Sequence, residues 1–267
     1  MRVSAQESLG THALLLVAAL FAVYPLGSIV AASMHQATGA GIGWGNFRVA
    51  WDRGHFGSAL VASAVVAVTV VAVTAVVSCL AGYATATMRV PGGRLVLGVL
   101  LLGLVLPYEV TVLPLYQMLS GWGLVDTYWA LILPQIGLSV PLGVFWMRSF
   151  FSSVPFEILE AAKIDGASRF KTLQLVLLPI AGPALATLAT ILFLFTWNEF
   201  LLALILVPEN QAAHTAPLAL SFFSGTDRSS NPDVTAAAAV LVAAPIVLAY
   251  VVLQRRLITG LTAGAVK

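Results

Sequence analysis

Two carboxylates lie inside long apolar stretches of this sequence, where a charged side chain is costly. Glu109 and Glu199 each interrupt a run that has no other charged residue. Ionisable groups in such surroundings usually face a polar cavity or a pairing partner, so they are functional candidates. Trp197 and Asn198 directly precede Glu199 and place an aromatic ring and an amide beside it. The alternative for either glutamate is a structural hydrogen bond to a neighbouring helix or subunit.

Other arrangements that support catalysis are missing from the sequence. The single cysteine, Cys79, cannot form an intrachain disulfide. The glycine-rich stretch at 39–45 lacks the Lys-Ser or Lys-Thr pair of a phosphate-binding loop. The histidines have no paired metal-ligand spacing, and they are His12, His35, His55 and His214. We therefore expect no enzymatic activity, no metal and no cofactor in this chain.

The composition is that of an integral membrane protein, with 60% hydrophobic and 9% charged residues. A helix needs about 20 apolar residues to cross a bilayer. A lone spanning segment must satisfy its backbone internally, which favours helix over strand. The sequence thus predicts an all-α membrane protein of a single domain. Its six transmembrane helices are expected at 12–33, 57–81, 95–118, 127–147, 178–207 and 234–254.

The basic residues set the expected orientation, because they favour cytoplasmic loops. With both termini in the cytoplasm, only Arg48, Arg53 and Arg228 of the 13 basic residues lie outside. The others are Arg2, Arg89, Arg94, Arg148, Lys163, Arg169, Lys171, Arg255, Arg256 and Lys267. The cations therefore mark topology, and the net charge of +2 gives no reason to expect nucleic-acid binding. An alternative for the first apolar stretch is a signal peptide, which would leave the other loops on the same sides.

The segment 149–178 is unusually polar for this chain and is expected in the cytoplasm. Ser152 and Ser153 can cap a helix that begins near Pro155. Gly166 can adopt a left-handed conformation and end that helix, after which Ser168 can begin another. The sequence predicts a helical elbow that feeds into the fifth span.

The elbow resembles the EAA motif of bacterial ABC importer permeases. Glu160-Ala161-Ala162 is followed after three residues by Gly166, and after nine more by Val176-Leu177-Leu178-Pro179. Val176 stands where the family usually has isoleucine. Asp165-Gly166-Ala167 and the C-terminal stretch at 260–267 are similar to the carbohydrate-type branch, whose relatives handle maltose, trehalose or glycerol phosphate.

The resemblance implies a multi-pass permease of the bacterial plasma membrane with the type I ABC importer fold. It implies a heterodimer with a second permease subunit, two ATPase subunits that bind ATP and Mg, and an extracytoplasmic solute-binding protein or lipoprotein. Coupling to the ATPases would pass through Glu160, Ala161, Ala162, Asp165, Gly166, Ala167 and Pro179. The external loop 208–233 would face the binding protein.

A sugar-like solute would suit the polar groups near the two glutamates. Hydroxyls need hydrogen-bonding partners and the ring needs an aromatic face, which Glu109, Trp197, Asn198 and Glu199 supply. The rival interpretation is a proton-coupled secondary carrier that protonates Glu109 and Glu199. It leaves the elbow unexplained, and the sequence lacks the inverted repeats often found in such carriers.

Overall fold

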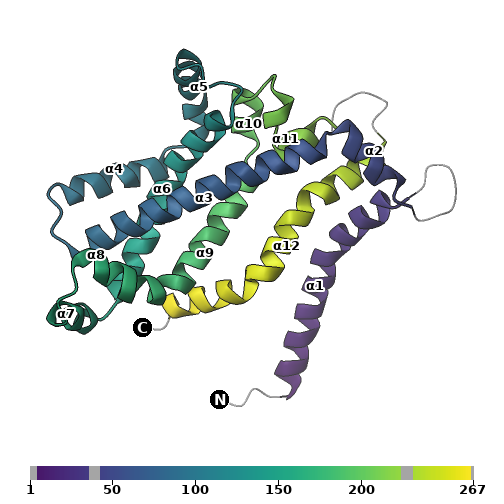
Figure 1. The fold of residues 1–267 in the computed structure, drawn as a ribbon. Helices are drawn as coiled ribbons and strands as arrows, with labels where there is room; N and C mark the ends of the chain where they lie inside the picture. Colours follow the sequence, from purple (N-terminus) through teal and green to yellow (C-terminus); the bar gives the residue numbers. More distant parts are fainter. Residues whose placement is uncertain (1–4, 36–42, 224–230, 266–267) are drawn as a thin grey trace. The chain divides into compact units, whose positions relative to one another are not determined.

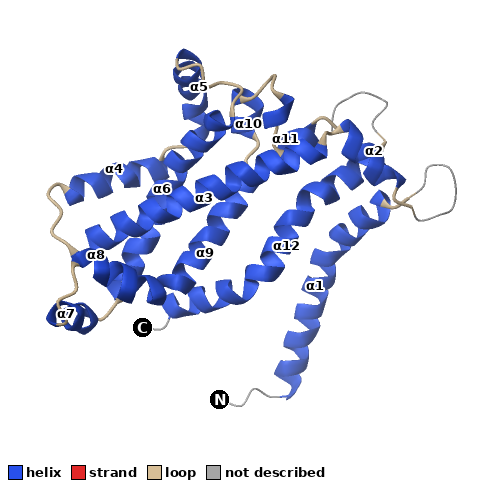
Figure 2. Ribbon diagram, viewed as in Figure 1, coloured by secondary structure: helices blue, strands red, loops and turns tan. Residues whose placement is uncertain are grey.

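The computed structural model describes residues 5–35, 43–223 and 231–265. Figures 1 and 2 show that regular structure in these residues is helical, without a strand. The chain divides into two compact units. One contains Met1–Gly57 and Ala219–Ala244, and the other contains Ser58–Leu218 and Pro245–Lys267.

Within the described residues, five helices are long and apolar enough to cross a membrane, and a bent pair at 93–121 would make a sixth span. The five are Gly10–Ser33, Phe56–Thr87, Tyr128–Ser153, Arg169–Trp197 and Pro232–Val251. They belong to α1 (Ala5–Ser33), α3 (Phe56–Thr87), α6 (Tyr128–Ser153), α9 (Leu178–Trp197) with the short helices before it, and α12 (Pro232–Ala265). The expected spans 12–33, 57–81 and 234–254 fall inside α1, α3 and α12.

The third span is not the single straight helix expected at 95–118. α4 (Gly93–Val105) ends before a sharp turn, and the 3-10 helix η1 (Tyr108–Thr111) and α5 (Val112–Gly121) continue at 97° to it. Pro107 is the physical reason, because it has no backbone N–H and forces the preceding residue out of the helical region. Leu106 is indeed extended, with φ −70° and ψ 128°.

The fifth span, expected at 178–207, is also interrupted. α9 ends at Trp197, and α10 (Leu201–Leu206) begins after three residues. Side chains bond to backbone groups on both sides of the break. The Asn198 amide nitrogen donates to the Leu194 carbonyl at 2.8 Å, and the Leu202 backbone N–H donates to the Glu199 Oε1 at 2.9 Å. Such bonds let a helix stop inside an apolar environment.

The predicted elbow forms, with one difference at its start. α6 runs through Ser153, so neither Ser152 nor Ser153 caps the next helix, and Pro155 directly precedes α7 (Phe156–Ile164). The Ser153 hydroxyl instead donates to the Phe150 carbonyl at 2.7 Å. The prediction that Gly166 ends α7 is confirmed by its φ of +74°.

Beyond Gly166 the chain turns into α8 (Arg169–Lys171). The Ser168 hydroxyl accepts from the Lys171 N–H at 3.4 Å, as the sequence predicts for a helix start. A π-helix, η2 (Thr172–Leu177), then joins α8 to α9. π-Helices are rare and are frequently found at functional sites.

Two apolar clusters stabilise the unit that contains these elements. One joins α5, α6 and α10 through Val112, Leu119, Leu131, Leu202 and Leu206. The other joins α3, α6, η2 and α9 through Tyr83, Met147, Phe151, Leu177 and Leu188. The first cluster supports the helices that follow the two breaks, and the second lies behind the elbow.

The expected external loop 208–233 is only partly a loop. η3 (Gln211–Ala213) and α11 (Ala216–Ser221) occupy part of it. Ala216 and Leu218 are buried, and the Ala216 N–H donates to the Ser63 hydroxyl of α3 at 2.8 Å. Part of this segment therefore packs into the protein instead of facing outward. Residues 224–230, with Arg228, lie outside the described residues.

Arg2, Lys267 and most of the glycine-rich stretch at 39–45 also lie outside the described residues. In the unit that contains α1, the helix α2 (Gly45–Arg53) follows that stretch. Phe56 stacks on Phe223 there, with ring centroids 6.1 Å apart.

Candidate solute pocket and coupling elbow

A cavity of about 890 Å³ opens beside the two helix breaks. It is large enough for a small organic solute, since ligand pockets commonly measure about 300–1,000 Å³. Three elements contribute its walls: the α4–η1 turn, the middle of α6, and the end of α9. The lining residues are 103–109, Gln135, Leu138, Ser139, Leu142, Leu192, 194–196, Asn198 and Glu199.

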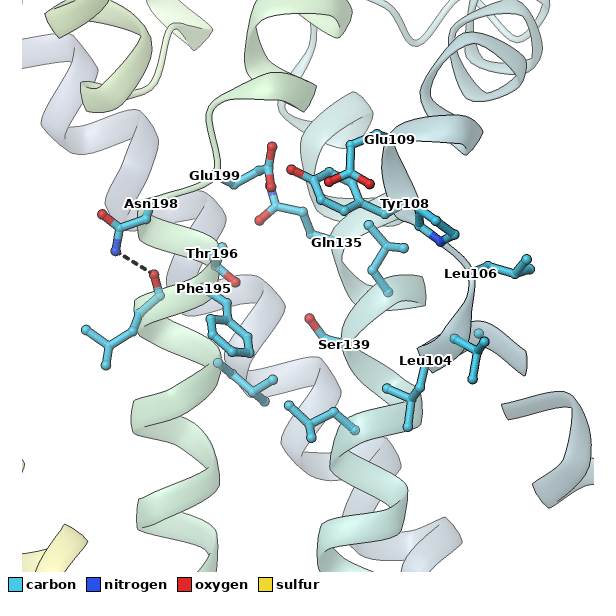
Figure 3. A pocket seen from close by; sticks show the side chains of 17 residues that line it. Leu104, Leu106, Tyr108, Glu109, Gln135, Ser139, Phe195, Thr196, Asn198 and Glu199 are labelled. Atoms are coloured by element: carbon cyan, nitrogen blue, oxygen red, sulfur yellow. Dashed lines mark hydrogen bonds between the residues drawn. The ribbon is translucent and has the colours of Figure 1, made fainter. Parts of the chain in front are cut away.

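Glu199 has a double role in this geometry. Its Oε1 accepts the Leu202 N–H and so fixes the start of α10. Figure 3 shows its carboxylate directed toward the Tyr108 hydroxyl. Figure 3 shows the Gln135 amide directed toward the same place. The bond to Leu202 lies within the expected fifth span, so it is not the bond to a neighbouring helix or subunit that the sequence left open, and the glutamate still lines the pocket.

Glu109 reaches the pocket because the chain bends just before it. The turn at Leu106–Pro107 ends α4, and Tyr108 and Glu109 follow directly in η1. Both residues line the cavity, and Figure 3 shows their side chains on the side opposite α9. The break thus brings Glu109 and Glu199 to opposite sides of one cavity.

α6 supplies polar groups that the sequence analysis did not select. Gln135 is 6% exposed, and Ser139 lies one helical turn further along and also faces the cavity. Residues four apart share a helix face. The sequence could have indicated these two residues, because a glutamine and a serine four residues apart in an apolar span usually face a polar partner or a cavity.

Trp197 does not line the pocket. It is 4% exposed and packs on Phe193, with ring centroids 5.4 Å apart. Phe195, which is 64% exposed, supplies the aromatic surface at this end of α9 instead. Asn198 does line the pocket, although its amide nitrogen is engaged by the Leu194 carbonyl.

The pocket combines an apolar wall with polar groups. Its apolar wall comes from leucines of α4, α6 and α9, while its polar groups gather at the two breaks. The described part of the chain has no group of three or more His, Cys, Asp or Glu that could hold a metal ion. Carboxylates, an amide and hydroxyls around an apolar wall can hold a solute with both hydroxyls and hydrocarbon surface.

The elbow presents a mixed surface of charges and large apolar side chains. Glu157, Glu160 and Lys163 are exposed. Phe156, Ile164 and Phe170 are 66%, 85% and 64% exposed. Of the small residues, Ala162 is buried against the protein while Ala161 is exposed. An exposed apolar patch with charges around it is typical of a protein-interaction site.

Two aromatic side chains join these elements to neighbouring helices, one at the elbow and one between α6 and α9. The Tyr83 hydroxyl of α3 donates to the Arg169 carbonyl of α8 at 3.1 Å, and its ring packs edge-on against Phe151. The Trp146 Nε1 of α6 donates to the Ala184 carbonyl of α9 at 3.0 Å. Neither contact could be inferred from the sequence, because each joins residues far apart in the chain.

Comparisons with known proteins agree with this architecture. A family model described as the inner membrane component of binding-protein-dependent transport systems matches residues 78–262. A trehalose transport system permease protein from Mycobacterium tuberculosis is 37% identical over 223 residues, which is 83% of this chain and 81% of that protein.

A trehalose/maltose transport system permease protein from Thermococcus litoralis is 35% identical, over 80% of this chain and 76% of the relative. Among solved structures, a bacterial ABC transporter involved in the import of the acidic polysaccharide alginate contains a chain with a similar fold. The TM-score is 0.76 at 21% identity, over 96% of this chain and 99% of the other.

Proposed function

This chain belongs to the family of inner membrane components of binding-protein-dependent transport systems, and on that basis we propose that it is the permease subunit of a sugar importer. It forms half of the translocation pathway, and a second permease subunit forms the other half. The solute is a sugar, an oligosaccharide or a related polyol derivative.

The observation that carries this proposal is the presence of two distinct features in one compact unit. A cavity between two interrupted helices offers carboxylates, an amide and hydroxyls. Interrupted transmembrane helices are typical of solute sites in transporters, because they free backbone and side-chain groups at membrane depth. The second feature is the exposed elbow, which leads through η2 directly into α9, the helix that ends at the cavity.

The elbow explains how a chain without a nucleotide site is driven. Two cytoplasmic ATPase subunits, which bind ATP and Mg, receive the surface around Glu160, Ala161 and Asp165. Gly166, Ala167 and Pro179 set the direction of the chain on either side of α8. Movement of the elbow is transmitted to α9 and alternates access to the cavity. The chain itself is a transport subunit and catalyses no reaction.

The sugar assignment is supported by chemistry and by the relatives. The trehalose and trehalose/maltose permeases are similar over most of their length. Glu109, Asn198 and Glu199 supply hydrogen-bonding groups, and Phe195 supplies an aromatic face. An extracytoplasmic binding protein delivers the solute and sets most of its selectivity.

The test is uptake by the reconstituted complex of this chain with its second permease, ATPase and binding protein. Uptake of a radiolabelled disaccharide such as trehalose or maltose should require ATP inside the vesicles. It should also require the binding protein outside. Uptake that proceeds without ATP and follows an imposed proton gradient would favour a secondary carrier that uses Glu109 and Glu199, and would refute the proposal.

A further inference from the structure

The short helix α2 is held at the junction of two membrane-length helices. The Asn46 amide nitrogen donates to the Ser33 carbonyl at 3.1 Å and to the His35 carbonyl at 2.7 Å, which fixes α2 to the end of α1. Its other end is two residues from Phe56, the first residue of α3. Since α1 and α3 are both long enough to span the bilayer, α2 must lie at a membrane surface.

The faces of α2 differ in chemistry. With about 100° per residue, Phe47, Trp51 and Trp44 lie next to one another. Ala50, which is fully buried, and Asn46 lie on the face toward the protein. Trp44 and Trp51 are 71% and 44% exposed. α2 therefore turns two indoles away from the protein that it is attached to.

The position of Trp51 is supported by the start of α3. A Cβ placed on Gly57 would lie 3.5 Å from the Trp51 ring, so the indole rests directly over this glycine. At the other end of the helix, the rings of Trp44 and Phe47 are 5.3 Å apart. The aromatic face is thus packed into a defined arrangement although much of it is exposed.

Two cations accompany this face in a place where cations are uncommon. In the expected topology, Arg48 and Arg53 are two of only three basic residues outside the cytoplasm. Both are exposed. Arg48 follows Trp44 by four residues and lies about 40° from it around the helix, and Asp52 lies about 40° further from the aromatic face. At a membrane interface, an arginine can bind the lipid phosphates while neighbouring indoles lie in the glycerol region.

We propose that α2 is a phospholipid-binding helix. Trp44, Phe47 and Trp51 insert at the level of the headgroups, and Arg48 binds the phosphate of an anionic phospholipid. Continuity with the two flanking membrane helices and the charge of Arg48 favour lipid over a protein partner. The bound lipid fixes the depth of α2 and hence the outer ends of α1 and α3.

The first test measures the depth of α2 in lipid. Trp44→Cys and Asp52→Cys are made separately in a Cys79→Ala background, labelled with a nitroxide and reconstituted in nanodiscs of phosphatidylcholine and phosphatidylglycerol. The label at 44 should be more accessible to oxygen than to a water-soluble nickel complex, and the label at 52 should show the reverse. Equal, water-like accessibility at both positions would refute insertion. So would a label at 44 that is shielded only after the extracytoplasmic binding protein is added.

The second test addresses Arg48. The wild type should retain phosphatidylglycerol when it is purified from mixed lipid, as measured by quantifying the co-purified lipid. Arg48→Gln should lower the affinity about fivefold, as expected for one basic residue at a membrane surface. Asp52→Asn is the matched control one turn beyond Arg48, further from the aromatic face, and it should retain the lipid at least as well. Unchanged retention by Arg48→Gln would show that this arginine does not bind the headgroup.

Discussion

At the pocket and at the elbow, helices end and the chain changes direction, but the exposed side chains at the two places point in opposite senses. At the pocket, Pro107 and the residues 198–200 break two helices, and polar side chains turn inward to one cavity. At the elbow, Gly166 reverses the chain, and charged and apolar side chains turn outward. In the proposed function, the inward-facing groups at the pocket hold a small solute, and the outward-facing groups at the elbow bind a protein partner.

The largest effect is expected from a change in the elbow backbone, which tests whether the elbow binds the ATPase. Gly166 has φ +74°, and an added Cβ would meet nothing within 4 Å. A valine there should therefore cost about 1–3 kcal/mol through backbone strain alone. We expect Gly166→Val to reach the membrane at normal levels but to lose both co-purification of the ATPase and sugar uptake.

Gly166→Asn is the matched control, because asparagine tolerates the left-handed region better than other residues with a side chain. It should retain most of the uptake. If Gly166→Val holds the ATPase and imports at the wild-type rate, the elbow is not the coupling element.

Charge reversal at the elbow should have the next largest effect. Glu160 is exposed on α7, so Glu160→Lys leaves the fold intact but places the opposite charge on the docking surface. We expect several-fold weaker co-purification of the ATPase, measured beside the amount of permease in the membrane. Lys163→Gln, on the same helix, is the comparison variant. Normal ATPase binding by Glu160→Lys would remove Glu160 from the proposed contact.

Substitutions at Glu199 test the proposed solute pocket. Glu199→Gln keeps an oxygen that can accept the Leu202 N–H, so α10 should form and uptake of a neutral sugar should fall only a few-fold. Glu199→Ala loses this acceptor as well, at a cost of about 1 kcal/mol as for other helix caps, and should reduce uptake further. Initial rates of sugar uptake, measured over a range of sugar concentrations, distinguish the Glu199→Gln variant from the Glu199→Ala variant. Complete loss in Glu199→Gln, with normal assembly, would instead favour a protonation cycle.

Tyr83 tests how firmly the elbow is tied to α3. Tyr83→Phe removes the hydroxyl that donates to the Arg169 carbonyl but keeps the packing on Phe151. One such hydrogen bond contributes about 0.5–1.5 kcal/mol, so ATPase binding should persist. We expect the ratio of sugar imported to ATP hydrolysed to fall about twofold. An unchanged ratio would show that this contact is not used in transmission.

The smallest effect is expected at Trp197. It is buried on Phe193 and outside the pocket, so Trp197→Phe should leave the sugar concentration for half-maximal uptake unchanged. Phe195→Ala, two residues earlier and exposed to the cavity, should raise it several-fold. A reversed order would place the aromatic contact of the solute at Trp197.

The sequence predicted the elbow better than the pocket, and the reason is the range of the interactions. Gly166 and Ser168 act on their own neighbours, so their effect on helix ends can be inferred locally. Which face of α6 meets the cavity depends on packing against α9, so Gln135 and Ser139 were not selected. Trp197 precedes Asn198 by only one residue, but about 100° of helix rotation turns it into the core.

The third span shows a different limit. Counting apolar residues treated 95–118 as continuous, although Pro107 was visible in it. A proline within a span is often accommodated as a mild kink when neighbouring groups satisfy the backbone. Here the extended conformation of Leu106 turned it into a 97° bend, which composition alone does not reveal.

The π-helix between the elbow and α9 has a mechanical consequence. A π-helix accommodates one more residue per hydrogen-bonded turn than an α-helix. If residues 172–177 adopted an α-helical conformation, the preceding elements α7 and α8 would rotate by about 100° and shift by about 1.5 Å relative to α9. The extra residue in η2 therefore allows the elbow to rotate relative to α9 through a π-to-α transition, without unfolding of either helix.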